Sequence, residues 1–343
     1  KFYCKIKKKK KIKKKKMLLV NLSLDKSKIN KYLSNTLLKE IDNSMQNNKK
    51  VILYLNKRWE YSSLICNKCS YLYKCPNCDN SMSIHNDNMT CHLCNFTQQV
   101  PENCEKCNSS ELQKVWVWTI QIENILRETY KDKNIFRLDT DIVKNKSDKE
   151  KALEILKNAQ IIIWTKMITT WFDFENVGLI WVILLEQELQ IPKYNTSEKV
   201  YSNIKQLFWR WSRLWVETNF VIQTFISENE LVKDIVYDNY KEFFIKTLKE
   251  RKTFNYPPFC ELATIEYRSK DIEKGLKYIN KIKDKLDLNN EKKEIQIILN
   301  PNYSKKYNQF YYKIIVKWNN LKNYLECIKN DIFRDSNLIV IFD

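Results

Sequence analysis

The chain has 343 residues, which is enough for two or three domains that each bury a core. Its hydrophobic content of 43% is typical of a globular protein and excludes a wholly disordered chain. The net charge is +19, but 11 lysines and no acidic residue lie in residues 1–16, which leaves +8 for the rest. A moderately basic body suits a polyanionic partner such as nucleic acid without proving one.

The lysine-rich run, residues 1–16, is predicted to be a disordered tail. A nucleic-acid-binding arm is one alternative, and a stretch translated from upstream of a true start at Met17 is another. No membrane span or signal peptide is predicted, because the apolar stretch Met17–Leu24 is short and interrupted by Asn21. Eleven cysteines without a secretion signal indicate metal thiolates in a reducing compartment, so we expect a cytoplasmic protein.

Up to about residue 228 the pattern alternates between strands and helices. A helix is predicted around residues 33–41, after a lead-in that begins at residue 17, and the apolar run Val51–Leu55 predicts a buried strand. Beyond a cysteine-rich segment, strands are predicted at 114–117, 135–138, 160–164, 179–185 and 220–225, with helices at 120–130, 148–158 and 197–214. This alternation predicts a parallel sheet in which one strand precedes the cysteine-rich segment and the others follow it.

From about residue 231 the order of elements changes. Strands are predicted at 262–267, 294–299, 309–317 and 338–342, and helices at 272–286 and 321–328. The resulting order βαββαβ is the split-βαβ pattern of a small α+β domain. The sequence therefore predicts an α/β domain over 17–60 and 113–228, a cysteine-rich insertion over 61–112, and a C-terminal domain over 229–343.

Four Cys-x-x-Cys pairs lie in the insertion: Cys66/Cys69, Cys75/Cys78, Cys91/Cys94 and Cys104/Cys107. Two residues between cysteines let one tight turn direct two sulfurs at one ion, and two such turns complete a tetrahedral Cys4 zinc site. Two structural zinc ions are therefore predicted, and full coordination leaves no position for a catalytic water. An iron site of the rubredoxin kind uses the same ligands and is an alternative. A redox role is disfavoured by four clustered pairs.

The pairs can be assigned to ions in two ways. The 12 residues between Cys78 and Cys91 suit a hairpin, so a nested arrangement is favoured: Cys66, Cys69, Cys104 and Cys107 on one ion, and Cys75, Cys78, Cys91 and Cys94 on the other. Sequential pairing is the alternative. The turns favour left-handed backbone after each second cysteine, where the sequence has Ser70, Asp79, Asn95 and Asn108. His85 and His92 are expected to be bystanders.

Several segments, in order, resemble one family. They are Leu55–Arg58, the four cysteine pairs, Trp118–Glu123, Arg137–Asp141, Ile161–Met167, Trp171–Phe174, Gln206–Arg213 and Tyr256–Phe259. The chain from about residue 20 to 343 is similar to the C-terminal half of the bacterial primosomal replication-restart helicases, the primosomal protein N′ family. The resemblance implies the second RecA-like lobe of a superfamily 2 helicase that uses ATP to unwind DNA in the 3′→5′ direction. It also implies branched or forked DNA, single-stranded-DNA-binding protein and other primosome proteins as partners.

By that resemblance, Gln206, Arg210 and Arg213 form the last helicase motif, and one arginine reaches the γ-phosphate of ATP between two lobes. A fixed guanidinium suits the charge of the phosphoryl transition state. Thr165 and Asp173 lie in the segment that couples ATP to the DNA backbone in such helicases. The plainer alternatives are solvated arginines, a cap at the end of a strand, and an acidic loop residue.

The chain departs from the family in lacking two ATP-binding motifs. It contains no G-x-x-x-x-G-K-[ST] phosphate loop and no D-E-x-H acidic motif, so the ATP-binding first lobe is missing from this sequence. ATP and Mg²⁺ are therefore expected only together with that lobe, and the chain alone is expected to be inactive, as a gene fragment or a split subunit. The alternatives are a non-enzymatic zinc-dependent nucleic-acid-binding protein and a degenerate gene product.

The chain also has 2 glycines and 10 tryptophans, where an average chain of this length has roughly 24 glycines. The tryptophans fall where the family has glycine, plausibly so at the last two of these positions: Trp59, Trp118, Trp164, Trp171, Trp181, Trp209, Trp215, Trp318, Trp116 and Trp211. Some bacteria read the UGA codon as glycine, so we hypothesise that most of the ten are glycine in the living protein. The alternative is that they are aromatic side chains that stack on DNA bases.

Overall fold

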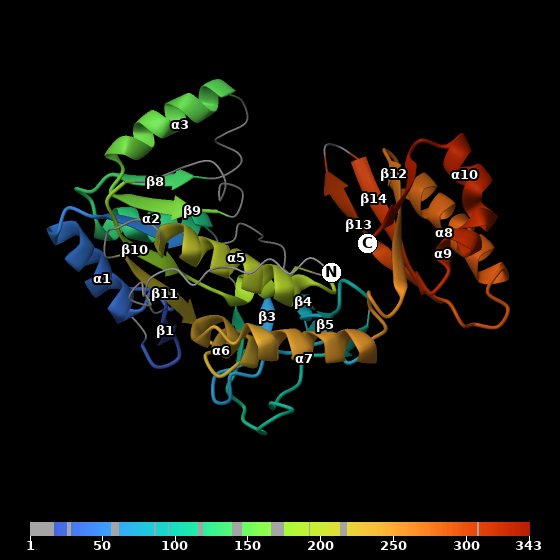
Figure 1. Ribbon diagram of the computed structural model, residues 1–343, viewed down its shortest axis with the longest axis horizontal. Coiled ribbons are helices and arrows are strands. Elements are labelled where there is room, and N and C mark those ends of the chain that lie inside the picture. The colour runs from blue at the N-terminus through green and yellow to red at the C-terminus, as the bar shows by residue number, and fades with distance from the viewer. Residues whose placement is uncertain are drawn as a thin grey trace, which may run out of the picture.

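The computed structural model describes residues 17–25, 29–55, 62–85, 87–94, 96–115, 119–138, 146–165, 175–191, 193–212, 218–306 and 309–343. Figure 1 shows an α/β body on one side and a smaller sheet with its own helices on the other, and the cysteine-rich segment lies beneath and between them.

The α/β body is built on a six-stranded sheet in which every neighbouring pair is parallel. Its order is β1-β11-β10-β2-β9-β8, with bounds Met17–Asn21, Asn219–Thr224, Val177–Val182, Lys50–Tyr54, Ile161–Trp164 and Ile135–Leu138. The predicted parallel sheet is confirmed. Strands β2, β9 and β10 are buried almost throughout, which explains their continuous apolar runs, since a strand covered on both faces needs no polar alternation.

Two details of the predicted sheet are wrong. Strand β1 belongs to the sheet and pairs with β11, so two strands precede the cysteine-rich segment rather than one. The strand expected at 114–117 is β7 (Leu112–Val115), and it pairs antiparallel with β3 (Ser63–Cys66) in a separate two-stranded sheet. It therefore closes the base of the cysteine-rich segment, because its partner lies within that segment.

Helices pack on the parallel sheet through their apolar faces. Helix α1 (Asn35–Gln46) begins where the Ser34 hydroxyl accepts a hydrogen bond from Leu37 N, and it packs on β2 and β10. Helices α2 (Thr119–Thr129) and α3 (Lys146–Asn158) pack on β8, and α6 (Glu230–Tyr237) packs on β1. Helix α5 (Thr196–Ser212) follows the short α4 (Glu186–Leu189) and contacts α6.

The cysteine-rich segment has only short strands. Besides β3 and β7 it contains the three-stranded antiparallel sheet β4-β5-β6, with bounds Ser83–His85, Asn88–Thr90 and Thr97–Gln99. Its core includes three of the cysteines together with Met82 and Met89. Strands of three or four residues bury too little apolar surface to be stable alone, so cross-links between the turns are expected to hold this segment together.

The C-terminal part follows the long helix α7 (Tyr240–Thr253). Its antiparallel sheet has the order β13-β14-β12-β15, with bounds Gln296–Lys306, Gln309–Trp318, Glu261–Ser269 and Leu338–Phe342. Helix α8 (Ile272–Leu288) and the run α9 (Leu321–Tyr324), η2 (Leu325–Ile328) and α10 (Lys329–Arg334) supply the two helical connections. The element order βαββαβ is thus the one predicted from the sequence, and these elements share a core of their own.

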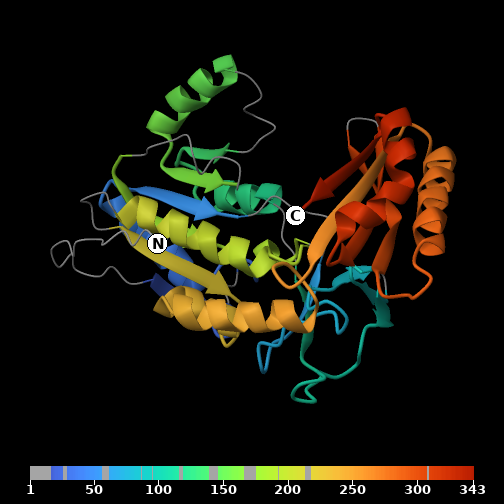
Figure 2. The ribbon, with the colours of Figure 1, turned by 45° about the vertical axis from the view of Figure 1, so that its right-hand side comes forward.

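Figures 1 and 2 show that the helices of this C-terminal sheet lie on its outer side, while the sheet itself faces the cysteine-rich segment. Leu262 and Ile315 of the sheet pack in the same apolar core as the cysteines. In the ranges that the structure describes, no helix is both long and apolar enough to cross a bilayer.

Candidate metal centres and helicase-motif residues

The eight cysteines form two groups. The outer group is Cys66, Cys69, Cys104 and Cys107, and the inner group is Cys75, Cys78, Cys91 and Cys94. Within each group the four sulfurs lie within 4.8 Å of one another. The structure therefore brings the pairs together in the nested arrangement and not in the sequential one.

The sulfur spacing fits a tetrahedral ion. In the outer group Cys66 and Cys107, and likewise Cys69 and Cys104, have sulfurs 3.6 Å apart. In the inner group the distances across the turns are 3.3 Å for Cys75–Cys94 and for Cys78–Cys91. Four sulfurs at about 2.3 Å from a central zinc ion are separated by roughly 3.8 Å. Both groups could hold a metal ion, which is consistent with two zinc ions.

The turns that carry the cysteines have the expected backbone. Ser70, Asp79 and Asn108 have φ values of 58°, 57° and 56°, in the left-handed region. In each case the backbone N–H donates to the carbonyl of the first cysteine of the pair, at 2.9, 2.8 and 2.8 Å. The prediction of left-handed residues is confirmed at these three positions, and Asn95 lies outside the described residues.

Burial shapes the acidity of the thiols. Burial raises the pKa of Cys66, and it raises the pKa of Cys69 to about 12. Because these two pKa values are raised, both thiols are protonated at neutral pH, and metal binding by them releases protons. His92 is in neither group, and the His85 side chain lies outside the described part of the chain.

The last helicase motif is described only in part. Gln206 lies on α5, is exposed, and donates from Nε2 to the Ser202 hydroxyl at 3.3 Å. Arg213, Asp173 and the side chain of Arg210 lie outside the described residues. Nothing in the described geometry tests the nucleotide role of these residues, which stays a prediction.

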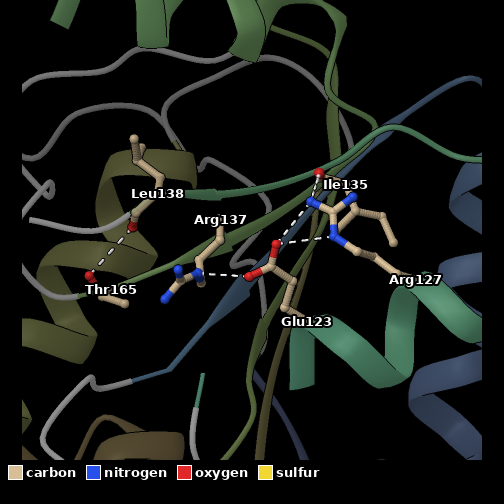
Figure 3. Close-up of polar contacts among 6 residues, drawn as sticks. All are labelled: Glu123, Arg127, Ile135, Arg137, Leu138 and Thr165. Carbon is tan, nitrogen blue, oxygen red and sulfur yellow. Dashed lines mark hydrogen bonds and ion pairs between the residues drawn. The ribbon is translucent and has the colours of Figure 1, made fainter. Parts of the chain in front are cut away.

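Thr165 follows the end of β9 and is almost fully buried. Its backbone N–H and its hydroxyl both donate to the carbonyl of Leu138 at the end of β8, at 3.3 and 3.4 Å (Figure 3). In this structure Thr165 therefore joins the carboxyl ends of two neighbouring strands. This agrees with the plainer alternative, a cap at the end of a strand.

Figure 3 also shows an ion-pair cluster that was not singled out from the sequence. Glu123 of α2 accepts from Arg127 Nε and Nη2 at 3.1 and 2.9 Å, and its other oxygen lies 2.8 Å from Arg137 Nε on β8. Arg127 also donates to the Ile135 carbonyl at 2.8 Å. The i, i+4 spacing of Glu123 and Arg127 was a usable signal, whereas the contact with Arg137 depends on the packing of α2 beside β8.

A buried acid was likewise missed. Glu186 of α4 is fully buried, and its Oε1 accepts from the Thr224 hydroxyl at 2.8 Å, from Ile226 N at 3.2 Å and from Phe225 N. Burial raises the pKa of Glu186 to about 7, against the lowering effect of these hydrogen bonds. The side chain therefore ties α4 to the end of β11.

Comparisons with known proteins support the resemblance seen in the motifs. The chain is 26% identical over 309 residues to the replication restart protein PriA of Chlamydia trachomatis serovar D, which covers 88% of this chain and 41% of that protein. It is 27% identical over 250 residues to PriA of Bacillus subtilis, covering 72% and 31% of the two chains. It is 28% identical over 259 residues to PriA of Borreliella burgdorferi, covering 74% and 38%.

No protein-family model matches the chain. A de novo designed protein, Foldit4, aligns with 24% of the chain at 15% identity and a TM-score of 0.21, which is too low to inform the fold. The chain spans well under half the length of each of the three PriA proteins named above. The resemblance seen in the motifs is confirmed: the chain is similar to the C-terminal region of replication restart proteins PriA.

Proposed function

We propose that this chain is the C-terminal part of an ATP-dependent 3′→5′ DNA helicase that acts in replication restart and primosome assembly. The observation that carries the proposal is the position of the two Cys4 groups. They lie between β2 and β8 of a parallel sheet, in a chain whose relatives are named replication restart proteins. A free-standing zinc module would not need a six-stranded α/β body around it.

Each part has a proposed role. Residues 17–60 and 113–228 form the second RecA-like motor lobe, 61–112 the zinc-binding insertion, and 229–343 a domain that binds branched or forked DNA. Ligands of open parallel sheets bind outside the carboxyl ends of the strands, and Thr165 lies at such an end. Asp173 is proposed to couple this edge to the DNA backbone.

ATP and Mg²⁺ would bind between this lobe and a first lobe that carries the phosphate loop. Gln206, Arg210 and Arg213 on and after α5 are proposed to face the γ-phosphate, where an arginine stabilises the charge of the transition state. The two zinc ions are structural, because four thiolates saturate each ion. Further proposed partners are single-stranded-DNA-binding protein and other primosome proteins, in the cytoplasm.

The proposal is tested by ATP hydrolysis in the presence of forked DNA. The chain alone is expected to show none, and a mixture with a purified first lobe of a PriA relative is expected to hydrolyse ATP. In the mixture, Arg210→Ala and Arg213→Ala should lower the hydrolysis rate, one of them by about 10³-fold or more. Lys151→Ala, at an exposed lysine on α3 outside the proposed DNA-binding domain, is the control and should leave the rate unchanged.

A mixture that binds forked DNA in a zinc-dependent manner but never hydrolyses ATP would contradict the helicase proposal. That result would instead favour the non-enzymatic zinc-dependent nucleic-acid-binding protein.

A further inference from the structure

Tyr256, in the turn between α7 and β12, lies against the inner Cys4 group. Its ring is buried in the same apolar core as Cys75, Cys78 and Cys91. Within the described residues its hydroxyl is buried and makes no regular hydrogen bond. Cys78 and Tyr256 also line the same pocket. A buried phenol donor without an acceptor is costly, so its partner is expected at this group.

The Tyr256 ring is also the centre of a stack that joins three parts of the molecule. It stacks on Tyr194, which precedes α5, with ring centroids 5.1 Å apart and planes at 18°. Arg251 Cζ of α7 lies 5.1 Å from the Tyr194 centroid, and Lys317 Nζ lies 3.7 Å from the Tyr256 centroid. The stack therefore has a cation against each of its two rings.

Lys317 connects this stack to the C-terminal sheet. It lies on β14, is almost fully buried, and donates to the Phe254 carbonyl at 3.2 Å. Leu262 of β12 packs in the core of the inner group. The C-terminal sheet thus contacts the cysteine-rich segment at the place where Tyr256 meets Cys78.

A bound metal ion would change the chemistry of this contact. Metal binding converts a cysteine thiol to a thiolate, which is a strong hydrogen-bond acceptor. Groups that hydrogen-bond to metal ligands orient them, and removal of such a group costs about 10- to 100-fold in metal affinity. Tyr256 supplies a matching donor, a buried hydroxyl that has no acceptor among the described residues.

We propose that Tyr256 is a positioning residue of the inner Cys4 group, whose hydroxyl donates a hydrogen bond to the Cys78 sulfur in the metal-bound state. Through Lys317, Tyr256 then makes the packing of the C-terminal sheet on the cysteine-rich segment depend on the metal at that group. This inference rests on the proposed metal sites. The ligand that Tyr256 acts on is a divalent cation bound by thiolates, and the part of the structure that responds is the pair of strands β12 and β14.

The first test measures zinc affinity of the whole chain by competition with a chromogenic chelator. The wild type is expected to hold two equivalents. Tyr256→Phe, which removes only the hydroxyl, should weaken one equivalent by about 10-fold or more and leave the other unchanged. Tyr194→Phe is the matched control, since Tyr194 shares the stack and packs against the cysteine core only as a partly buried neighbour, and it should leave both equivalents unchanged.

The second test measures backbone hydrogen exchange in the C-terminal sheet and in the turn before it. A change in metal affinity confined to the inner group would not alter these exchange rates. Cys78→Ser, in the inner group, should speed exchange in residues 254–262 and 313–318, whereas Cys69→Ser, in the outer group, should not. Lys317→Met should keep both zinc equivalents and still speed exchange in β14.

Two outcomes separate the possible failures. A wild-type chain that holds no metal would overturn both the metal sites and this inference. Two tight equivalents in the wild type, together with a Tyr256→Phe variant whose affinities match those of Tyr194→Phe, would overturn this inference alone.

Discussion

At the scale of single residues, the tryptophans that the structure describes refine the glycine hypothesis. Trp164 and Trp181 are fully buried in β9 and β10, and Trp209 is about half exposed. Among the non-glycine residues described with positive φ there is no tryptophan, so left-handed backbone does not explain glycine at these positions. The Trp181 indole N–H is buried with no hydrogen-bond partner among the described residues, which is unusual for a native tryptophan. The hypothesis therefore rests on the family pattern and on this unsatisfied donor.

The first prediction concerns Trp181→Gly. An ordinary core tryptophan loses about 3–5 kcal/mol of unfolding free energy on truncation. If glycine is the residue of the living protein, we expect the substitution to cause no such loss in urea unfolding. Ile222→Ala on the neighbouring strand β11 is the control and should lose about 2–5 kcal/mol. A large loss for Trp181→Gly, or UGG codons at these positions, would count against the hypothesis.

The second prediction concerns pH and Glu186. Its folded pKa of about 7 lies above the value of 4.5 that it has when unfolded, because burial disfavours the charged form. The folded state therefore binds the proton more tightly, and this contribution to stability is fully present below about pH 4.5 and lost as pH rises through 7. By linkage it amounts to about 3 kcal/mol.

Glu186→Gln keeps an oxygen for the backbone N–H groups of Phe225 and Ile226 and cannot ionise. Urea midpoints at pH 5 and pH 7.5 should differ less for the variant than for the wild type. Equal pH dependence in the two proteins would show that Glu186 titrates normally.

At the scale of elements, the C-terminal end of helix α3 is bound by a lysine from strand β2. Lys50 of β2 donates from Nζ to the carbonyls of Leu156, Lys157 and Ala159 at 2.8, 2.6 and 3.1 Å. These carbonyls have no partner within the helix, and a cation there also complements the helix dipole. Burial lowers the pKa of Lys50, because it disfavours the charged ammonium that makes these contacts.

The third prediction is that Lys50→Met destabilises the protein by about 1–2 kcal/mol and speeds hydrogen exchange in the last turn of α3. Lys151→Met, on the exposed side of the same helix, should change the stability by no more than about 0.5 kcal/mol. Unchanged exchange in Lys50→Met would mean that water replaces the lysine at no cost.

At the scale of the whole molecule, the parts differ in what holds them together. The parallel sheet and the C-terminal sheet each have a large apolar core, whereas the core of the cysteine-rich segment includes thiols that could bind metal. The fourth prediction is that a zinc chelator removes hydrogen-exchange protection from residues 62–115 while β2, β9 and β10 keep theirs. Added zinc should restore the protection. Full protection after complete metal removal would show that apolar packing alone holds the segment.

Local patterns were enough to predict the parallel sheet, the split-βαβ order and the left-handed backbone after three of the four Cys-x-x-Cys pairs. An apolar run such as Val51–Leu55 reports burial on both faces, and Asp79 or Asn108 after a cysteine pair reports the backbone that the turn needs. These are properties of neighbouring residues, so they can be read along the chain.

Long-range packing decided the rest. Three contacts join segments whose local sequence patterns do not predict which segment they pair with. They are β1 beside β11, β7 paired with β3, and Glu123 with Arg137. The same holds for Tyr256 and Cys78, which lie far apart in the chain and share one apolar core. Strand pairing and side-chain contacts of this kind depend on the relative position of whole elements, and that position follows from burying their apolar faces together.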